Sequence, residues 1–410
     1  MKGNRDSFGA MIGGLVETGK IRRRIFAHLI PLYLSIPRRI NFSQMAFYGQ
    51  HNEGTYHNWF RTGLDVKGFN ESLVEAHGSG DHFVIFDPSY LPKSGKKTPH
   101  LGWYWSGCAG TVKRGLEIGG FAVADLINHS AFHLEASLTP CSEELKKEGK
   151  TLVEHYISLV EKQSQTIRKF GNLLVVDGYF GIFNFVKAVS EGMSIDLISC
   201  LRTNAVLHYT ISPPLEKKKR GRPRKKGEKV DWANIDEAQL PIIFTDDEKR
   251  VRSGKVYVKS LKRIVMLVAT EFLRPDGSML CRKLFFSTNV EAQPLRVLEQ
   301  YRCRFQIEFL YRDAKQFTGL TQCQSTDQVK IENHINLSLT TVSAAKAAHW
   351  LAIPKEERGP FSMAEIKTYY HNLLLIERFS VALGLNPTDT KNNPKIKELL
   401  LSTCYEPVAA

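Results

Sequence analysis

The stretch 301–315 combines residue types that bind phosphate groups and metal ions. It carries Tyr301, Arg304, Glu308 and Lys315, at spacings of three, four and seven. On one continuous helix, which advances about 100° per residue, these side chains fall within an arc of roughly 60°. One helix face would then present a carboxylate beside an aromatic hydroxyl and two cations. Such a face predicts a divalent metal ion at Glu308, with phosphates held on either side by the other three residues.

Two aspartates elsewhere follow apolar runs that are typical of buried strands. Asp87 follows residues 83–86 and Asp177 follows residues 173–176. Because active sites of layered folds collect where strands end, we expect both carboxylates at one edge of a sheet. Taken alone, each aspartate is better explained as a turn former, since Asp-Pro and Asp-Gly are common turn pairs. Together with Glu308 they favour a shared site.

Three clustered carboxylates repel one another in a poorly hydrated site, and divalent cations relieve the repulsion. Oxygen-only ligands favour Mg²⁺, with Mn²⁺ as a substitute, over zinc. Two such ions about 3.5–4 Å apart can activate a water or a 3′-hydroxyl for attack on a phosphodiester. We therefore expect Asp87, Asp177 and Glu308 to be both catalytic residues and the ligands of two Mg²⁺ ions. The structural alternative for Glu308 is an exposed salt bridge to Arg304 or Arg312, worth only about 0.3–0.5 kcal/mol.

The bulk composition indicates a soluble globular protein with a polyanionic partner. The 410 residues are 42% hydrophobic and 24% charged, and the net charge is +14. Such a charge predicts nucleic acid as the partner. We expect no membrane partner, because no run approaches about 18 apolar residues. No secretory segment is recognisable at the N-terminus, so we expect a cytoplasmic protein.

The positive charge is concentrated in one segment. Residues 217–226 contain eight cations, and the sequence Arg-Gly-Arg-Pro within them resembles an AT-hook core. We expect Arg220, Arg222 and Arg224 to bind DNA, because extended Arg-Gly-Arg-Pro fits a narrow minor groove. A solvated disordered run, or phosphate binding without sequence preference, explains the segment nearly as well.

A second group of candidate DNA contacts follows Asp87. Lys93 is expected to meet the DNA backbone, together with the nearby Lys96 and Lys97. Trp103 and Trp105 are either core residues or platforms on which an unpaired base stacks.

Hydrophobic patterning predicts an α/β fold with a mixed sheet. The expected strands are 83–86, 115–126, 131–138, 173–176 and 195–201, and the expected helices are 142–170 and 183–191. Beyond the basic segment, strands are expected at 256–258, 264–272 and 280–287, with a turn at 275–277. Helices are expected at 331–351 and around 363–383, and the tail from residue 386 is expected to be polar and mobile as far as residue 396.

The first eighty residues are predicted to be helical. Residues 44–48 and 52–61 could form two short helices joined by a glycine-containing turn, the outline of a helix-turn-helix DNA reader. A helical hairpin packed on the main domain explains the same pattern at least as well.

Three segments together resemble a known family. They are FDPSYLPKSG with Asp87, VVDGYFG with Asp177, and the pattern Y-x2-R-x3-E-x6-K formed by Tyr301, Arg304, Glu308 and Lys315. They resemble the DDE transposases of bacterial insertion sequences, and the last pattern is similar to the signature of the insertion-sequence-four group. The resemblance implies an RNase H-like, retroviral-integrase-like core with a β-rich insertion and helical N- and C-terminal parts.

The expected domain boundaries follow from the patterning and the resemblance together. A helical DNA-binding region is expected at 1–80, the two parts of the core at 81–203 and 291–352, the β-rich insertion at 204–290 and a helical C-terminal region at 353–410.

The resemblance also implies a function. The implied function is that of a DNA transposase, which cleaves insertion-sequence ends and transfers the strand in a cut-and-paste reaction. Its partners would be double-stranded DNA, as terminal inverted repeats and target, and a second copy in a synaptic homodimer. The protein would be bacterial and nucleoid-associated. Two alternatives remain: a catalytically inactive DNA-binding repressor derived from a transposase, and a plain metal-dependent nuclease.

Overall fold

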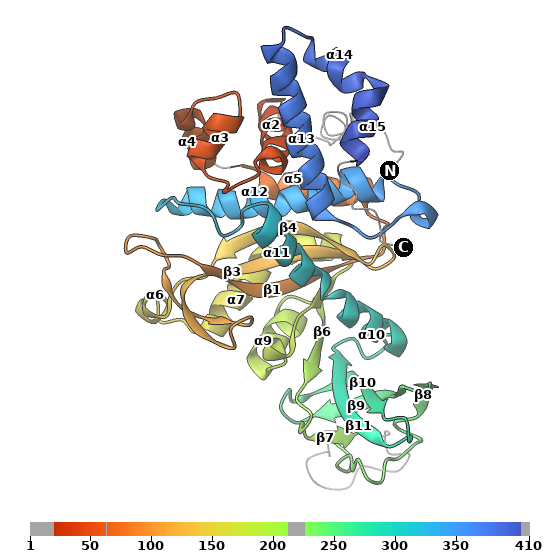
Figure 1. The fold of residues 1–410 in the computed structure, drawn as a ribbon. Coiled ribbons are helices and arrows are strands. Elements are labelled where there is room, and N and C mark those ends of the chain that lie inside the picture. The colour runs from red at the N-terminus through yellow and green to blue at the C-terminus, as the bar shows by residue number, and fades with distance from the viewer. Residues whose placement is uncertain (1–19, 63, 212–225, 403–410) are drawn as a thin grey trace.

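The chain folds as a mixed α/β protein. The computed structural model describes residues 20–62, 64–211 and 226–402. Figure 1 shows a central sheet with helices on both faces, a helical part on one side of it and a β-rich part on the other.

Five strands form the central part of the sheet, in the order β4-β3-β1-β5-β6. They are β1 (His82–Pro92), β3 (Thr111–Asp125), β4 (Ser130–Leu138), β5 (Leu173–Val175) and β6 (Asp196–Leu201). β1, β5 and β6 run parallel to one another, whereas β3 is antiparallel to both β1 and β4. Strand β2 (Gly102–Ser106) continues the sheet beyond β3. The predicted mixed sheet is confirmed.

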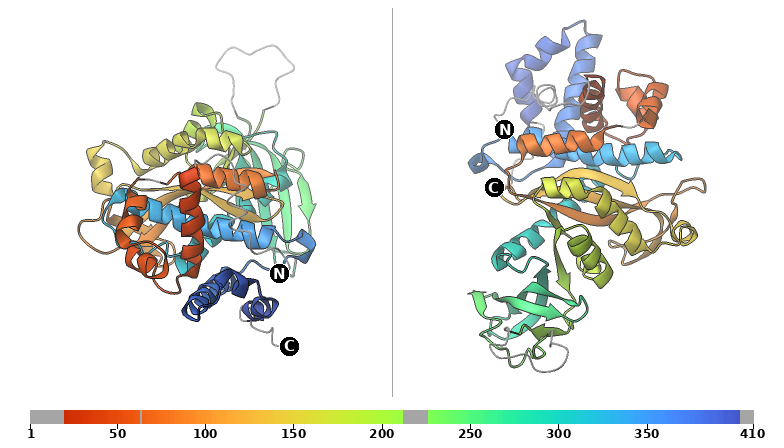
Figure 2. Two further views of the ribbon diagram at one scale, coloured as in Figure 1. Left: turned by 90° about the horizontal axis from the view of Figure 1, so that it is seen from above. Right: turned by 180° about the vertical axis from the view of Figure 1, so that it is seen from behind.

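Helices cover the two faces of this sheet. Helix α7 (Leu152–Lys162) lies against one face, and α11 (Gln306–Phe317) lies against the other. Neighbouring residues of β3 demonstrate this, because a Cβ on Gly119 would meet Leu159 of α7 and a Cβ on Gly120 would meet Tyr311 of α11. Side chains of successive strand residues point to opposite faces. Figure 2 shows the same two layers from above and from behind.

Two further helices complete the layer on the α11 side. They are α5 (Val66–His77) and α12 (Gln328–Lys346), and both contact β4. Most of α12 is buried, including Asn336, whose amide accepts from Ala136 N of β4 at 2.7 Å and donates to Ala136 O at 2.8 Å. The predicted long buried helix at 331–351 is therefore confirmed, with its last turn a π-helix at Ala347–Leu351.

The single helix expected at 142–170 is wrong. The structure has three helices there, α6 (Ser142–Lys147), α7 and α8 (Ser164–Lys169). Gly149 stops the first one, because its φ of +68° is a left-handed conformation that favours glycine. Thr151 then starts α7 with a capping box to Glu154.

The segment between β6 and α10 (Pro294–Cys303) is rich in strands. It contains β7 (Leu207–Tyr209), β8 (Ile242–Thr245), β9 (Lys249–Val258), β10 (Arg263–Leu273) and β11 (Met279–Ser287). The strands expected at 256–258, 264–272 and 280–287 are confirmed, as is the turn at 275–277. Antiparallel pairing of β11 with β6 makes this part continuous with the central sheet.

The N-terminal helices pack onto the core. They are α2 (Lys20–Ser35), α3 (Phe42–Tyr48) and α4 (Glu53–Thr62). Helix α4 buries Phe60, whose carbonyl accepts a hydrogen bond of 2.7 Å from Asn333 of α12. The pair α3–α4 therefore has the contacts of a helical hairpin docked on the core, and Asn41 caps α3.

The C-terminal part is more helical than expected. It comprises α13 (Met363–Ala382), α14 (Pro387–Asn392) and α15 (Pro394–Ser402). The segment from residue 386, expected to be polar and mobile, forms helices. Asn386 and Asn393 each accept a backbone N–H and precede a proline at the first helical position. Among the helices in the described ranges, none is long and apolar enough to cross a membrane.

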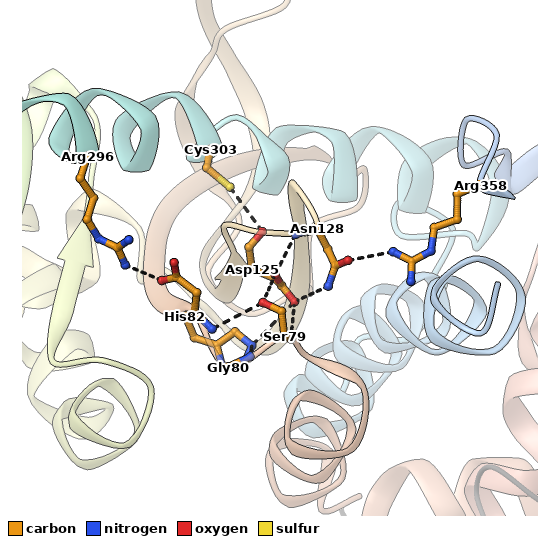
Figure 3. Close-up of polar contacts among 9 residues, drawn as sticks. Ser79, Gly80, His82, Asp125, Asn128, Arg296, Cys303 and Arg358 are labelled. Carbon is orange, nitrogen blue, oxygen red and sulfur yellow. Dashed lines mark hydrogen bonds and ion pairs between the residues drawn. The ribbon is translucent and has the colours of Figure 1, made fainter. Parts of the chain in front are cut away.

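A buried carboxylate holds the start of β1 in place. Asp125, at the end of β3, accepts hydrogen bonds from Ser79 N at 2.8 Å and Ser79 Oγ at 2.6 Å. It also accepts from Asn128 N at 3.0 Å and from Asn128 Nδ2 at 2.9 Å, and His82 lies 3.8 Å away. Figure 3 shows this cluster, which Arg358 extends through Asn128. The cluster links the α5–β1 connection to the β3–β4 turn.

We expect two buried histidines to make the fold sensitive to acid. Burial lowers the pKa of His133 and of His334 to about 4, from an ordinary value of 6.5. His334 donates from Nε2 to Gly319 O at 2.7 Å, and its Nδ1 accepts from Tyr33 at 2.9 Å. Protonation would place a positive charge in this fully buried position. Because the unfolded chain binds protons first, the contribution is complete above pH 6.5 and is lost as the pH falls toward 4.

The effect is about 3 kcal/mol for one such imidazole. The measurement is urea unfolding at pH 7 and pH 4.5, followed by circular dichroism, for the wild type and for His334→Gln. The wild type should lose about 2 kcal/mol more than the variant over this interval, since pH 4.5 is still above the folded-state pKa of about 4. Equal losses would contradict the assignment of the pH dependence to His334.

Candidate active site

Asp87 lies within β1 rather than at its end. The strand continues to Pro92, with Asp87 opposite Gly120 of β3. The expectation that the strand stops at Asp87 is wrong, and the reason is local. On its other edge β1 pairs with β5 only at Val84 and Ile85. Pro88 therefore needs no backbone N–H on that side, and the strand can pass through it.

Asp177 lies two residues beyond the end of β5, as a cap of the short 3₁₀ turn Gly178–Phe180. Its Oδ1 accepts from Tyr179 N at 2.9 Å, and its carbonyl accepts from Ser199 Oγ of β6 at 2.6 Å. The half-buried carboxylate is thus held at the end of a parallel strand.

The register of the sheet brings the two aspartates to equivalent positions. Ile85 of β1 is paired with Val175 of β5 in a parallel ladder. Asp87 and Asp177 each follow these partners by two residues, and side chains two apart in a strand share a face. The charges of Asp177 and Glu308 both act on Asp87. The three carboxylates therefore lie in one electrostatic neighbourhood.

The predicted continuous helix over 301–315 is wrong. Helix α10 ends at Cys303 and α11 begins at Gln306. Between them the backbone keeps helical dihedral angles at Arg304 but makes i→i−3 hydrogen bonds, from Arg304 N to Tyr301 O and from Ile307 N to Arg304 O. Tyr301 therefore belongs to one helix, and Glu308 and Lys315 to the next.

Arg304 joins the strand and the helix at this break. Its guanidinium is 3.2 Å from Asp87 Oδ1 and 2.8 Å from Glu308 Oε1, and the residue is 6% exposed. The salt bridge between Glu308 and Arg304, considered above as the structural alternative, is present. It is not an ordinary surface pair, because the same guanidinium also binds the aspartate of β1. In the described part of the chain, the buried Nε of Arg304 has no hydrogen-bond partner.

Lys315 and Tyr301 lie on either side of this centre. Lys315 Nζ donates to Ser89 Oγ at 3.0 Å, two residues beyond Asp87 on β1. The hydroxyl of Tyr301 donates to Cys200 Sγ of β6 at 3.3 Å. The half-buried Lys315 thus faces the β1 side, and the half-buried Tyr301 faces the β6 side.

The carboxyl of Asp87 has a raised pKa. Burial raises the pKa of Asp87 to about 7, the charge of Arg304 opposes the rise, and Asp177 and Glu308 add to it. Three carboxylates therefore lie near one guanidinium, and the charge of Lys315 also opposes the rise in this pKa. The donors are oxygens only, which is the ligand set that Mg²⁺ and Mn²⁺ prefer.

This chemistry fits divalent ions, but the arrangement is not that of a preformed metal cage. Within the described ranges, no group of three His, Cys, Asp or Glu side chains is positioned to hold a metal ion. Arg304 lies between Asp87 and Glu308, where it supplies the countercharge. A metal ion bound by both carboxylates would have to displace the guanidinium from this position.

Four further residues were predicted to contact DNA, and the structure describes only one of them, Lys93. Arg220, Arg222 and Arg224 lie outside the described residues. The amine of Lys93 donates to two backbone carbonyls, Cys323 O and Ser325 O, the second at 3.0 Å. It is thereby tied to the segment that follows α11.

The two tryptophans of β2 are exposed rather than core residues. Trp103 is 68% exposed and Trp105 is 61% exposed. Both lie on the same side of the strand, since Tyr104 between them is buried. Of the two interpretations considered for them, burial in the core is wrong.

Sequence reasoning missed Tyr311, which completes the site. Its hydroxyl donates to Asp87 O at 2.7 Å. A Cβ on Gly120 would lie 2.0 Å from the hydroxyl oxygen of Tyr311. A signal was available, because glycines inside a strand pattern mark a close approach.

Replacing Gly120 with Ala should therefore displace Tyr311 and shift β1. We expect a loss of about 1–3 kcal/mol in unfolding free energy, the usual cost of overpacking. Chemical denaturation measures it. In the double variant Gly120→Ala/Tyr311→Phe the hydroxyl is gone, and the nearest ring atom lies 3.1 Å from the new Cβ. Part of the lost stability should therefore return. The control is Gly192→Ala, whose Cβ meets nothing within 4 Å. If Gly120→Ala is as stable as this control, the contact is not tight.

Comparison with known proteins identifies the family. The model of the transposase DDE domain family matches residues 109–343, more than half of the chain. The chain therefore belongs to the family of transposase DDE domains. The matched span includes Asp177 and Glu308, and Asp87 lies before it. A search of curated proteins finds no match.

Family membership supports a transposase, and hence an enzyme whose partner is DNA. DDE transposases generally use divalent metal ions, which agrees with the oxygen-only donor set described above.

Proposed function

We propose that the protein is a cut-and-paste DNA transposase of the insertion-sequence-four group. It cleaves the ends of its element and joins the freed 3′-hydroxyl to target DNA. One observation carries the proposal. Asp87 in β1 and Asp177 just after β5 each follow a paired residue of these adjacent parallel strands by two positions, and Glu308 shares a guanidinium with Asp87.

The strand order supports an RNase H-like core. A long antiparallel meander, β1-β3-β4, is followed by β5 and β6 added parallel on the other side of β1. The β-rich segment between β6 and α10 would be the insertion that separates the second aspartate from the glutamate. This supports the proposed boundaries at 204–290.

Asp87, Asp177 and Glu308 would hold the divalent ions. When bound, two Mg²⁺ ions supply Lewis-acid activation of the attacking oxygen and stabilisation of the leaving oxygen. Arg304, released from the carboxylates, becomes free to bind a DNA phosphate. Its unpartnered Nε supports this, because a buried donor without an acceptor is costly.

The other side chains position the strand. Lys315 would bind a phosphate on the β1 side and Tyr301 one on the β6 side. The exposed indoles of Trp103 and Trp105 fit unpaired bases near the cut, since stacking contributes about 1–3 kcal/mol per base. The net charge of +14 favours the approach of DNA. We propose that two copies bring the element's ends together, in the bacterial cytoplasm at the nucleoid.

The decisive experiment incubates the full chain with Mg²⁺ and a labelled duplex that carries the terminal repeat flanking its gene, together with a target plasmid. Cleaved ends joined to the plasmid are the expected product. Cleavage without joining would mean a plain nuclease. Specific binding of the repeat without any cleavage would mean the inactive repressor.

A further inference from the structure

A basic cavity lies beyond the end of β1, five residues after Asp87. It has a volume of about 720 Å³, and its lining includes Arg39, Lys93, Lys96 and Lys97 but no Asp or Glu. Within the described residues, none of these four cations forms an ion pair with a carboxylate. By contrast, Lys169 pairs with Glu71 and Glu75, and Arg282 pairs with Glu271. The cavity is therefore a concentration of uncompensated positive charge.

Three segments far apart in the sequence build the cavity. One is the loop after β1, one is the segment after α11, and the third is the approach to α3. Lys93 ties the first two together through Cys323 O and Ser325 O. Gln322 ties the third, because its Oε1 accepts from Ile40 N at 2.6 Å. The walls are thus fixed by internal hydrogen bonds, while the exposed Arg39, Lys96 and Lys97 remain available to a ligand.

Two elements of the candidate active site, β1 and α11, lead to the walls of the cavity. Strand β1 carries Asp87 and then leads to Pro92 at the cavity wall. Five strand residues span about 17 Å. Helix α11 carries Glu308 and Lys315 and then leads to the opposite wall at Thr321. At an axial rise of about 3.4 Å per nucleotide, the cavity is roughly five nucleotides from a phosphate held at Asp87.

We propose that this cavity is a DNA-backbone subsite, in which Arg39, Lys96 and Lys97 bind phosphates about five nucleotides from the cleavage position. The inference rests on the proposed function and locates a part of its substrate. The ligand is a polyanion, because the cavity gathers several cations that no carboxylate neutralises. Lys93 does not contact the phosphates in this proposal, because its amine is bonded to backbone carbonyls of the cavity wall. Arg39, Lys96 and Lys97 make those contacts.

The test measures how DNA binding depends on salt. Fluorescence anisotropy follows binding of the terminal-repeat duplex in EDTA between 50 and 200 mM NaCl, for the full chain and for Lys96→Ala/Lys97→Ala. The slope of log K against log salt should become shallower by about 0.9 for each lost phosphate contact, or about 1.8 for the pair. Arg39→Ala alone should change it by about 0.9.

The matched control is Lys395→Ala/Lys397→Ala, which removes the same charge from exposed positions on α15. Its slope should equal that of the wild type. Methylphosphonate linkages placed about five nucleotides from the cut should weaken binding to the wild type and not to Lys96→Ala/Lys97→Ala. Thermal melts of all variants confirm that each is folded.

The outcomes are distinct. Equal slopes for the cavity variant and the wild type, or equal changes in the cavity variant and the control, would overturn the proposal. It is also overturned if inorganic phosphate or a nucleoside triphosphate binds the cavity while DNA binding ignores the substitutions. A wild type that never cleaves but shows the expected slopes would refute the transposase reaction and leave the subsite supported.

Discussion

Replacing Asp87, Asp177 or Glu308 with its amide should lower the rate of DNA cleavage at least about a thousand-fold. Each carboxylate would contribute charge to the divalent ions that stabilise the transition state, a contribution of several kcal/mol. Each 1.36 kcal/mol corresponds to a factor of ten in rate. The measurement is single-turnover cleavage of the labelled terminal-repeat duplex with saturating Mg²⁺, using Asp87→Asn, Asp177→Asn and Glu308→Gln.

Binding and folding should survive these substitutions. In EDTA the variants should bind the duplex at least as well as the wild type, because each removes a negative charge near the DNA. The matched control is Glu299→Gln, an exposed carboxylate on α10 that should leave cleavage unchanged. An amide variant that cleaves within tenfold of the wild type would remove that residue from the proposed metal site.

Replacing Asp125 with Ala should cause the largest loss of stability, about 3–5 kcal/mol. The side chain is fully buried, and its removal leaves donors of Ser79 and Asn128 without an acceptor. Burial raises the pKa of Asp125, but hydrogen bonds from His82, Ser79 and Asn128 outweigh burial and hold it well below its ordinary value of 3.8. The carboxylate therefore stabilises the fold above about pH 4, and this stabilisation is lost as the pH falls further.

Urea denaturation at pH 7 measures the loss. The control is Asp81→Ala, which removes the partner of Arg296 at a partly exposed salt bridge, one residue before His82 in the sequence. That change should cost less than about 1 kcal/mol. If the two variants are equally stable, the Asp125 cluster does not anchor β1, and its hydrogen bonds are not the reason for the position of this strand.

Much of the local structure could be predicted because it depends on neighbouring residues. Alternating and continuous apolar runs located the strands β3, β4, β6, β10 and β11. The errors have local causes too. Pro88 was interpreted as the end of a strand, although a proline is tolerated where a strand has no neighbour on one side. Gly149 was accepted inside a helix that it ends.

The candidate site was predicted as a set of residues but not as an arrangement. The helix break at Arg304 could not be found from spacing, because the side chain turns inward to carboxylates 217 residues away and four residues away. Tyr311 lies only three residues beyond Glu308, yet its contact with Asp87 depends on the gap that Gly120 leaves in β3. The basic cavity was likewise hidden, since it joins Arg39 to a loop more than fifty residues further on.

The sequence by itself determined the chemical identities: two aspartates after apolar runs, a glutamate among an arginine, a tyrosine and a lysine, and a large excess of positive charge. Only the tertiary structure decided that Asp87 and Asp177 occupy equivalent positions, and that Arg304 lies between Asp87 and Glu308. The physical reason is that the spacing of apolar and polar side chains depends on the local backbone conformation, helix or strand. The meeting of distant residues is fixed by the register of parallel strands and by buried charges that must find partners.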